Sequence, residues 1–363
     1  MWAPRFPIVR IRALVLTSIL SSLEGRLLFA VPKSEQGPKL LKPQQLTIYL
    51  EGRLHTAALS LLSGSSISFR RKDRLDIALV TNLNIALVFL PAADIPTFVG
   101  EGRVDLGITG RDQVAEHEAL NPPTSTLGVT EVLDLGFGKC KLQVQVPENG
   151  AIKNPRDLIG KTVATSFVNL TTKYFAELEG RDPSCPAHQL ATTIKFLGGS
   201  VETACALGVA DGIVDLVESG ETMVAAGLHP LSTLISSTAV LIRSRRSTAP
   251  QMADLITNRI HGFVTAQRYV MCQYNIPRAR LPEAIAITPG KRAPTINALE
   301  TEGWLAVSSM VEKKRIASAM DELVKVGAQD ILELSISNTR MGHHDERGDH
   351  KEISDGTESE SLI

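Results

Sequence analysis

Residues 219–222, Ser-Gly-Glu-Thr, have types suited to binding an anion. They follow the apolar segment 213–217 and precede a helical run that starts at Met223. A turn of small residues between a strand and a helix directs several backbone N–H groups to one point, where they can bind a phosphate. Asp211 and Asp215 flank the strand, and such carboxylates could take ribose hydroxyls or, through a metal ion, a pyrophosphate. The segment predicts a site for a phosphorylated sugar, although an ordinary turn beside two surface acids has the same pattern.

The composition limits the classes of protein to consider. The chain has 363 residues, of which 43% are hydrophobic and 4% aromatic, so we expect two or three domains with aliphatic cores. A formal net charge of −1 argues against a nucleic-acid partner, which would need a basic face. The four cysteines form no Cys-x-x-Cys pair, which favours a reducing, cytoplasmic compartment over a zinc site or a disulfide framework. No apolar stretch is long enough to suggest a membrane partner.

The order of apolar and helical segments predicts an α/β fold with parallel or mixed sheets. We expect strands at 27–32, 77–80, 85–90, 104–110, 142–146, 162–165, 193–197, 213–217 and 239–242. Helical spacing occurs at 53–62, 95–99, 175–178, 201–207 and 223–226, and Asp112 could cap a further helix. Beyond residue 262 the order becomes strand-helix-strand-strand-helix-strand, which is typical of a ferredoxin-like domain.

Several stretches resemble one enzyme family. Residues 202–223 are similar to the signature of the ATP phosphoribosyltransferases, which begin histidine biosynthesis. Residues 74–79, 87–110, 142–147 and 303–312 agree with it, and the resemblance, to the fungal long form, extends over about residues 24–341.

The resemblance implies a two-lobed catalytic core, like periplasmic binding proteins, and a C-terminal ferredoxin-like, ACT-like regulatory domain. Lobe I would comprise residues 24–107 and 239–261, lobe II residues 108–238, and the regulatory domain residues 262–341. Residues 1–23 would be a leader, either disordered or a targeting segment, and residues 342–363 a disordered acidic tail.

The implied reaction joins N1 of ATP to the ribose of phosphoribosyl pyrophosphate and releases pyrophosphate, with Mg²⁺ as cofactor. The Mg²⁺ would rest on pyrophosphate oxygens and water, so no protein side chain is assigned as a metal ligand. Histidine would be a feedback inhibitor, and the protein would be a homo-oligomer, a hexamer or a dimer. The alternative is a non-catalytic small-molecule binding protein with the same two-lobed fold.

The resemblance also gives expected roles to individual residues. Glu218, Ser219, Gly220, Glu221 and Thr222 would hold the 5′-phosphate of phosphoribosyl pyrophosphate. Asp215 and Asp211 would orient the ribose hydroxyls, while Lys33 and Arg53 would meet the triphosphate or pyrophosphate charge.

A second group would line the cleft or its hinge: Asp105, Gly107, Thr109 and Gly110, with Lys141 and Ser166 as weaker candidates.

The chain departs from the family pattern at two places. In the family a Pro-Lys and a Gly-Arg-Leu are almost adjacent, whereas residues 34–51 separate Pro32-Lys33 from Gly52-Arg53-Leu54. This segment is either an unusual insertion or a translated stretch of retained intron, and it could displace Arg53. The sequence Asn338-Thr339-Arg340 also replaces the expected Asn-Cys-Arg.

Overall fold

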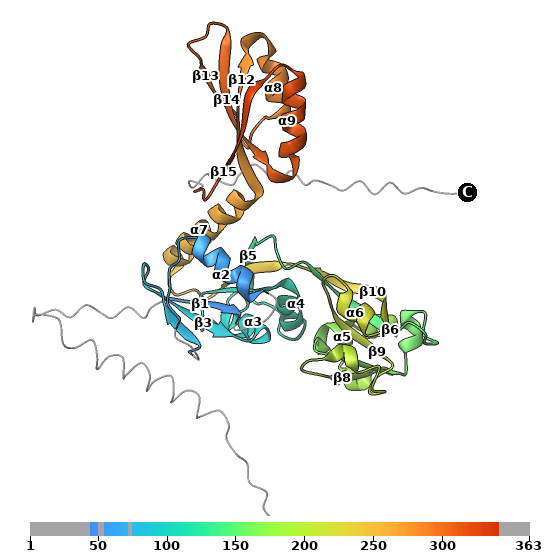
Figure 1. Cartoon of the computed structure of the whole chain (residues 1–363). Helices are drawn as coiled ribbons and strands as arrows, with labels where there is room; N and C mark the ends of the chain where they lie inside the picture. Colours follow the sequence, from blue (N-terminus) through green and yellow to red (C-terminus); the bar gives the residue numbers. More distant parts are fainter. Residues whose placement is uncertain (1–43, 50–53, 72–74, 341–363) are drawn as a thin grey trace, which may run out of the picture. The chain divides into compact units, whose positions relative to one another are not determined.

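The computed structural model describes residues 44–49, 54–71 and 75–340, which form three sheets with their covering helices (Figure 1). The first sheet has six strands in the order β2-β3-β1-β4-β11-β5. These are β1 (Gln44–Tyr49), β2 (Ile77–Leu79), β3 (Ile85–Leu90), β4 (Leu106–Gly110), β5 (Val129–Asp134) and β11 (Ala239–Ser244). Strands β3, β1 and β4 run parallel, and the other three are antiparallel to their neighbours.

Four helices contribute buried side chains to the core of the first sheet. They are α2 (His55–Gly64), α3 (Ile95–Gly100), α4 (Arg111–Leu120) and α7 (Pro250–Arg268). Leu61, Val99, Val114 and Ile256, one from each helix, lie in the same cluster of buried aliphatic residues. In α2 and α7 the buried residues recur at helical spacing, so one face of each meets the sheet, whereas α4 contributes only Val114 to this core.

The second sheet has the strand order β10-β6-β9-β7-β8. Its strands are β6 (Cys140–Pro147), β7 (Thr162–Thr165), β8 (Thr193–Phe196), β9 (Gly212–Val217) and β10 (Leu228–Ser237). Strands β8, β7 and β9 are parallel, so their carboxyl ends share one edge of the sheet.

Different elements cover the two faces of the second sheet. Helix α5 (Val168–Leu178) packs Phe175 against the face that carries Val214. The short helix α6 (Glu221–Ala225) and the 3-10 turn η4 (Val201–Thr203) lie on the opposite face, with Ile213.

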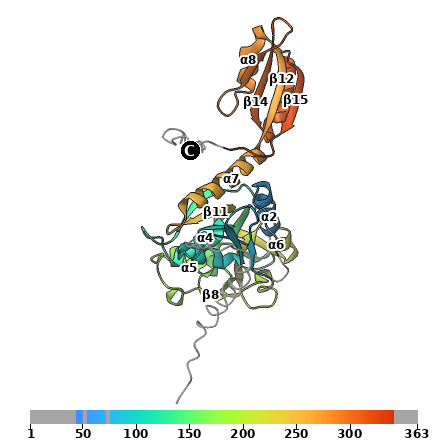
Figure 2. The ribbon, with the colours of Figure 1, turned by 90° about the vertical axis from the view of Figure 1, so that its left-hand side faces the viewer.

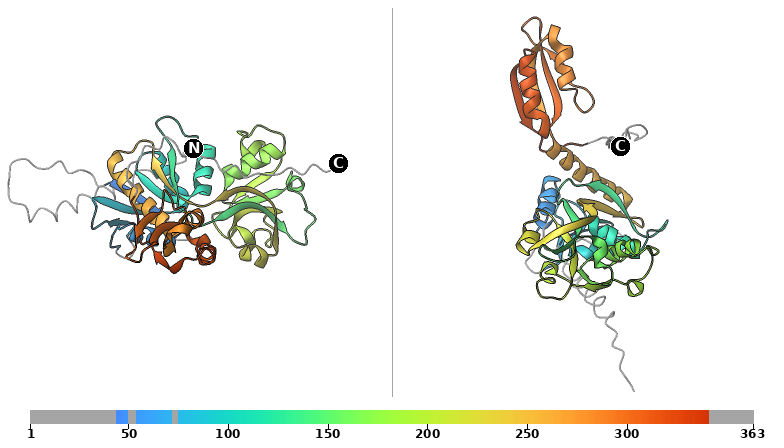
Figure 3. Two further views of the ribbon diagram at one scale, coloured as in Figure 1. Left: turned by 90° about the horizontal axis from the view of Figure 1, so that it is seen from above. Right: turned by 90° about the vertical axis from the view of Figure 1, so that its right-hand side faces the viewer.

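The third sheet has the order β13-β14-β12-β15, with every neighbouring pair antiparallel. It consists of β12 (Tyr269–Pro277), β13 (Thr295–Ala298), β14 (Trp304–Glu312) and β15 (Gln329–Ser335), with α8 (Leu281–Ile287) and α9 (Ile316–Lys325) between strands. Alternate residues of β12 and β14 are buried, and the two helices pack onto that face (Figures 2 and 3). This is the strand order of a ferredoxin-like fold.

Two secondary-structure predictions are wrong. A 3-10 turn replaces the helix expected at 201–207, because Ser200 and Gly208, both at positive φ, bound a segment too short for a stable helix. Asp112 does not cap α4, whose N-cap is Gly110; it lies in the first turn instead.

The prediction for residues 34–51 is also wrong in part. This polar segment contains β1, which pairs with β3 on one side and β4 on the other, in the interior of the first sheet. Pairing on both sides, with Leu46 fully buried, determines this strand, although its local pattern is weak. The strand predicted at 27–32 lies outside the described residues.

The predicted lobe boundary at residue 107/108 needs correction. It divides β4, and it assigns α4 and β5 to lobe II, yet β5 pairs with β11 in the first sheet. Val129 and Val114 lie in the core of that sheet. The chain instead crosses to the second sheet between β5 and β6, through residues 135–139, and returns at Thr238, between β10 and β11. None of the described helices has the length and apolarity of a membrane span.

Candidate active site

The predicted phosphate loop lies between β9 and α6. Gly220 is the N-cap of α6 and has φ 85°, a conformation that side-chain-bearing residues rarely adopt. Around it, Glu218, Ser219, Glu221 and Thr222 are exposed. The Ser219 hydroxyl accepts a weak hydrogen bond from the Glu221 N–H, with 3.4 Å between Oγ and N. An exposed turn with this geometry offers N–H groups and two hydroxyls to an incoming anion.

Asp215, near the carboxyl end of β9, is a half-buried carboxylate with a raised pKa. Its Oδ1 accepts a hydrogen bond from the Leu216 N–H at 2.8 Å. Burial raises its pKa from 3.8 to about 6, and the negative charge of Glu202 acts in the same direction. Among the described residues, no cationic side chain contributes to this shift. The carboxylate is thus ionised at neutral pH in poorly hydrated surroundings, where hydrogen-bond donors of a ligand would stabilise it.

The neighbouring strand β6 adds polar groups to the same face of the sheet. Gln143 pairs with Asp215 and Lys141 pairs with Val217, and residues directly opposite each other share a face. The Gln143 side chain donates a hydrogen bond to the Thr233 hydroxyl at 2.9 Å. Lys141 is exposed, one residue pair from the start of the phosphate loop, and could meet a negatively charged leaving group.

The sheet registers bring the carboxyl ends of both sets of parallel strands to the interlobe crossings. At the end of β4, Gly110 pairs with Ala239, the first residue after the return crossing. Ser237, just before that crossing, pairs with Cys140, and the next residue Lys141 pairs with Val217 at the end of β9. The loops after β4, β7 and β9 therefore lie near the two crossings, residues 135–139 and Thr238, which together form the hinge between the lobes. Open α/β sheets bind ligands at the carboxyl ends of their strands.

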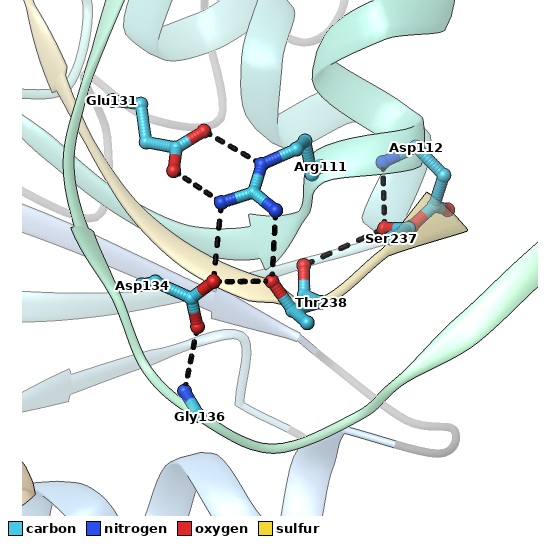
Figure 4. A network of polar contacts seen from close by, with 7 residues as sticks. All are labelled: Arg111, Asp112, Glu131, Asp134, Gly136, Ser237 and Thr238. Carbon is cyan, nitrogen blue, oxygen red and sulfur yellow. Dashed lines mark hydrogen bonds and ion pairs between the residues drawn. The ribbon is translucent and has the colours of Figure 1, made fainter. Parts of the chain in front are cut away.

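A polar network joins α4 to both crossings (Figure 4). The guanidinium of Arg111 bonds to Glu131, to Asp134 Oδ2 at 3.2 Å and to Thr238 Oγ1 at 3.2 Å. The backbone N–H of Arg111 also donates to the Thr238 carbonyl at 3.0 Å, and Thr238 Oγ1 donates to Asp134 at 2.9 Å. Burial raises the pKa of Asp134, but the Gly136 N–H, the Thr238 hydroxyl and Arg111 together lower it further than burial raises it. The network fixes the start of α4 to the hinge.

The second part of the network explains the glycine at position 110. The Ser237 hydroxyl donates to Asp112 Oδ1 and accepts from the Asp112 N–H at 2.9 Å. A Cβ on Gly110 would come within 2.3 Å of Asp112 Oδ1. A side chain there would push this carboxylate away from Ser237, which is a packing reason for the glycine; its predicted role at the cleft or hinge stays a prediction.

Two predicted acids are not near the phosphate loop. Asp211 precedes β9 and so lies at the opposite edge of the sheet, about 20 Å from Val217 along the strand. Its carboxylate accepts from the Thr162 N–H at 2.9 Å and fixes the start of β7. Asp105 likewise precedes β4, and its Oδ1 accepts from Ser247 Oγ and the Thr248 N–H, each at 2.9 Å. The structure thus does not bring Asp211, predicted to orient the ribose, or Asp105, predicted to line the cleft or its hinge, to the phosphate loop; each carboxylate fixes a local turn.

The remaining predicted residues have separate outcomes. Gly107 is buried in the middle of β4, where it pairs with Ile242. Thr109 is fully buried near the carboxyl end of β4, and Ser166 directly follows β7 at the cleft edge. Lys33 and Arg53 lie outside the described residues, so their roles stay predictions.

The comparisons with known proteins decide the family. Residues 91–262 match the model of the HisG family, ATP phosphoribosyltransferase, and residues 266–338 match the HisG C-terminal domain. The chain is 55% identical to the ATP phosphoribosyltransferase of Yarrowia lipolytica, over 89% of this chain and 99% of that protein. It is 51% identical to the Saccharomyces cerevisiae enzyme over the same shares. The chain belongs to the ATP phosphoribosyltransferase family.

Members of this family are pentosyltransferases and catalyse the first step of histidine biosynthesis. The alternative prediction of a non-catalytic binding protein therefore loses its basis. Among solved structures, a Thermotoga maritima HisG:HisZ complex matches 60% of this chain and 96% of that chain, at 21% identity and a TM-score of 0.49. Family membership does not depend on that likeness.

Proposed function

We propose that this chain transfers the phosphoribosyl group of phosphoribosyl pyrophosphate to N1 of ATP and releases pyrophosphate. Family membership gives the reaction class, and the observation that supports the site is the loop after β9 beside the half-buried Asp215. In this proposal the amides and hydroxyls of residues 219–222 bind the 5′-phosphate. Asp215 accepts hydrogen bonds from the ribose hydroxyls and so fixes the direction of the anomeric carbon.

The reaction needs no nucleophilic side chain. N1 of ATP forms a bond to C1 of the ribose as the bond from C1 to the pyrophosphate oxygen breaks. Holding the two reactants in line can contribute about 7–11 kcal/mol to lowering the barrier. Positive charge beside the leaving pyrophosphate contributes further. We assign that role to Lys141 in the described part of the chain, and to Lys33 and Arg53 by resemblance.

The polar groups present fit a magnesium-bound substrate. Asp215 is ionised at neutral pH, and no cation among the described residues shifts its pKa, so its charge is open to the ribose hydroxyls or to a water molecule of a magnesium-bound substrate. When bound, Mg²⁺ would neutralise part of the pyrophosphate charge. Asp215 would orient the ribose beside it, and Lys141 would face the leaving group.

Incubation of the purified chain with ATP, phosphoribosyl pyrophosphate and Mg²⁺ should release pyrophosphate. Coupling to pyrophosphatase draws the reaction forward, and reactions without ATP or without Mg²⁺ are the controls. We expect pyrophosphate only in the complete mixture. Its absence there, from folded protein that binds phosphoribosyl pyrophosphate, would contradict the proposed activity.

We further propose that the ferredoxin-like domain binds histidine as a feedback inhibitor, in a cytoplasmic homo-oligomer that is a hexamer or a dimer. Because equilibrium coupling between sites is reciprocal, saturating substrates should weaken histidine binding by the factor by which histidine weakens substrate binding. Calorimetric titration of histidine with and without phosphoribosyl pyrophosphate measures this factor. An unchanged histidine affinity would contradict equilibrium coupling.

A further inference from the structure

Helix α5 has no N-terminal cap of its own. Its N-cap residue is Phe167, which makes no side-chain cap hydrogen bond, and its first turn contains no acidic residue. The first N–H groups of a helix have no partner within the helix and need one from elsewhere. In α5 that partner comes from a different helix.

Glu116 of α4 supplies the missing cap. Its Oε1 accepts from the Asn169 N–H at 2.8 Å and its Oε2 accepts from the Leu170 N–H at 2.9 Å. In return the Asn169 side-chain amide donates to the backbone carbonyl of Glu116 at 3.2 Å. Burial raises the pKa of Glu116, while these backbone donors act in the opposite direction. Three hydrogen bonds thus join one residue of α4 to the first turn of α5.

The two helices belong to different cores. Helix α4 packs Val114 into the core of the first sheet, and Arg111 fixes its first turn to the hinge. Helix α5 packs Phe175 into the core of the second sheet. The bonds of Glu116 are therefore contacts between the lobes, and a change of lobe angle must stretch or break them.

The start of α5 is also tied to the edge of the sheet that carries the phosphate loop. It follows β7, which runs parallel to β9. The Thr165 hydroxyl donates to the Val214 carbonyl at 2.7 Å and accepts from the Phe167 N–H at 2.9 Å. A displacement of the first turn of α5 thus reaches the strand that carries Asp215 through Thr165.

We propose that Glu116 is a positioning residue: by capping α5 from the other lobe, it holds the two halves of the substrate cleft at the angle that binds both substrates. This inference rests on the proposed function, since it assigns ATP and phosphoribosyl pyrophosphate to that cleft. Without the hydrogen bonds of Glu116, the lobes would sample several angles, and only a fraction of the molecules would have the angle that binds substrate. The apparent affinity for both substrates falls in proportion to that fraction. Chemistry in the closed complex is unchanged.

The test is the change Glu116→Gln, which keeps one acceptor and replaces the other with an amide donor. We expect the KM of both substrates to rise about tenfold while kcat stays within about twofold. Glu118→Gln is the matched control, because the same change two residues away removes no bond to α5, and it should leave both constants unchanged. Unchanged KM values in Glu116→Gln would overturn the inference.

A second variant distinguishes the effect of the hydrogen bonds between the lobes from the effect of capping helix α5. In Glu116→Gln combined with Asn169→Asp, α5 has a carboxylate in its own first turn, which stabilises a helix start. We expect the melting temperature to recover toward that of the wild type while the raised KM values remain. Recovery of KM together with the melting temperature would reduce Glu116 to a local cap and overturn the inference.

The failure of this inference differs from failure of the proposed function. Pyrophosphate release by the wild type tests the function. The positioning role of Glu116 is tested only by the ratio of KM values between each variant and the wild type. If the wild type releases no pyrophosphate, calorimetric dissociation constants for phosphoribosyl pyrophosphate replace KM. Should Glu116→Gln fail to fold, Asn169→Ala removes only the bond to the Glu116 carbonyl. We then expect a two- to threefold loss of affinity, and an unchanged affinity would overturn the inference.

Discussion

Asp215→Asn should lower kcat/KM for phosphoribosyl pyrophosphate by about 100-fold and at the same time make the protein more stable. The loss reflects hydrogen bonds from ribose hydroxyls to a charged acceptor, worth about 1.5–3 kcal/mol. The gain follows from the raised pKa, since a shift from 3.8 to about 6 makes the ionised carboxylate costly in the folded state. One pKa unit corresponds to 1.36 kcal/mol, so the gain approaches about 3 kcal/mol.

The sign of the pH dependence follows from the same shift. The folded state binds the proton of Asp215 more tightly than the unfolded state, so the wild type loses stability as pH rises from about 4 to above 6. Asp215→Asn lacks this loss. The stability advantage of the variant should be absent below pH 4 and complete above pH 7, as measured by urea unfolding. Equal stability of the two proteins at pH 7.5 would contradict the burial of this charge.

Activity should show the same titration. We expect kcat/KM of the wild type to fall as pH drops below about 6, where Asp215 is protonated. A substrate phosphate can titrate in this range as well. Glu202→Gln separates the titration of Asp215 from that of the substrate, because it removes a charge that raises the pKa of Asp215. If Asp215 causes the fall in kcat/KM, that fall should move to lower pH in this variant. If the fall in kcat/KM occurs at the same pH in Glu202→Gln as in the wild type, the titration belongs to the substrate.

Thr222→Val should raise the KM for phosphoribosyl pyrophosphate about 10- to 100-fold and leave the KM for ATP nearly unchanged. The change keeps the shape of the side chain and removes a hydroxyl that we expect to bond to a charged phosphate, a contact worth about 1.5–3 kcal/mol. Thr222 is exposed, so the free energy of unfolding should change by less than about 0.5 kcal/mol. Calorimetric titration of phosphoribosyl pyrophosphate measures the affinity directly.

Thr193→Val is the matched control for this prediction. Thr193 is also exposed, but it begins β8 and so lies at the amino edge of the second sheet, opposite the loop. The same chemical change there should affect neither KM. Equal effects of the two variants would show that Thr222 has no special place, and an unchanged affinity in Thr222→Val would remove it from the phosphate site.

Local features of the fold could be predicted from the sequence. The strand β9, the turn at Gly220 and the helix α6 follow one another along the chain, so their pattern is complete within residues 211–226. The C-terminal sheet was predictable because β12 and β14 alternate with period two and α9 is amphipathic. In both cases neighbouring residues determine the element.

Other features depend on partners far along the chain. Asp211 and Asp105 looked like site residues because they flank strands, but both precede their strands and so lie at the amino edge. The direction of the chain could have shown this. The cap of α5 by Glu116 and the Arg111–Thr238 contact have no such signal, because they join residues that meet only when the sheets pack. Strand β1 is similar, since it is defined by pairing with β3 and β4.

A crystal structure with phosphoribosyl pyrophosphate and Mg²⁺ tests the central claim most directly. We predict density for the 5′-phosphate against the backbone N–H groups of residues 219–222, with the ribose hydroxyls within hydrogen-bond distance of Asp215. An empty loop, with the sugar bound elsewhere in the protein, would contradict it.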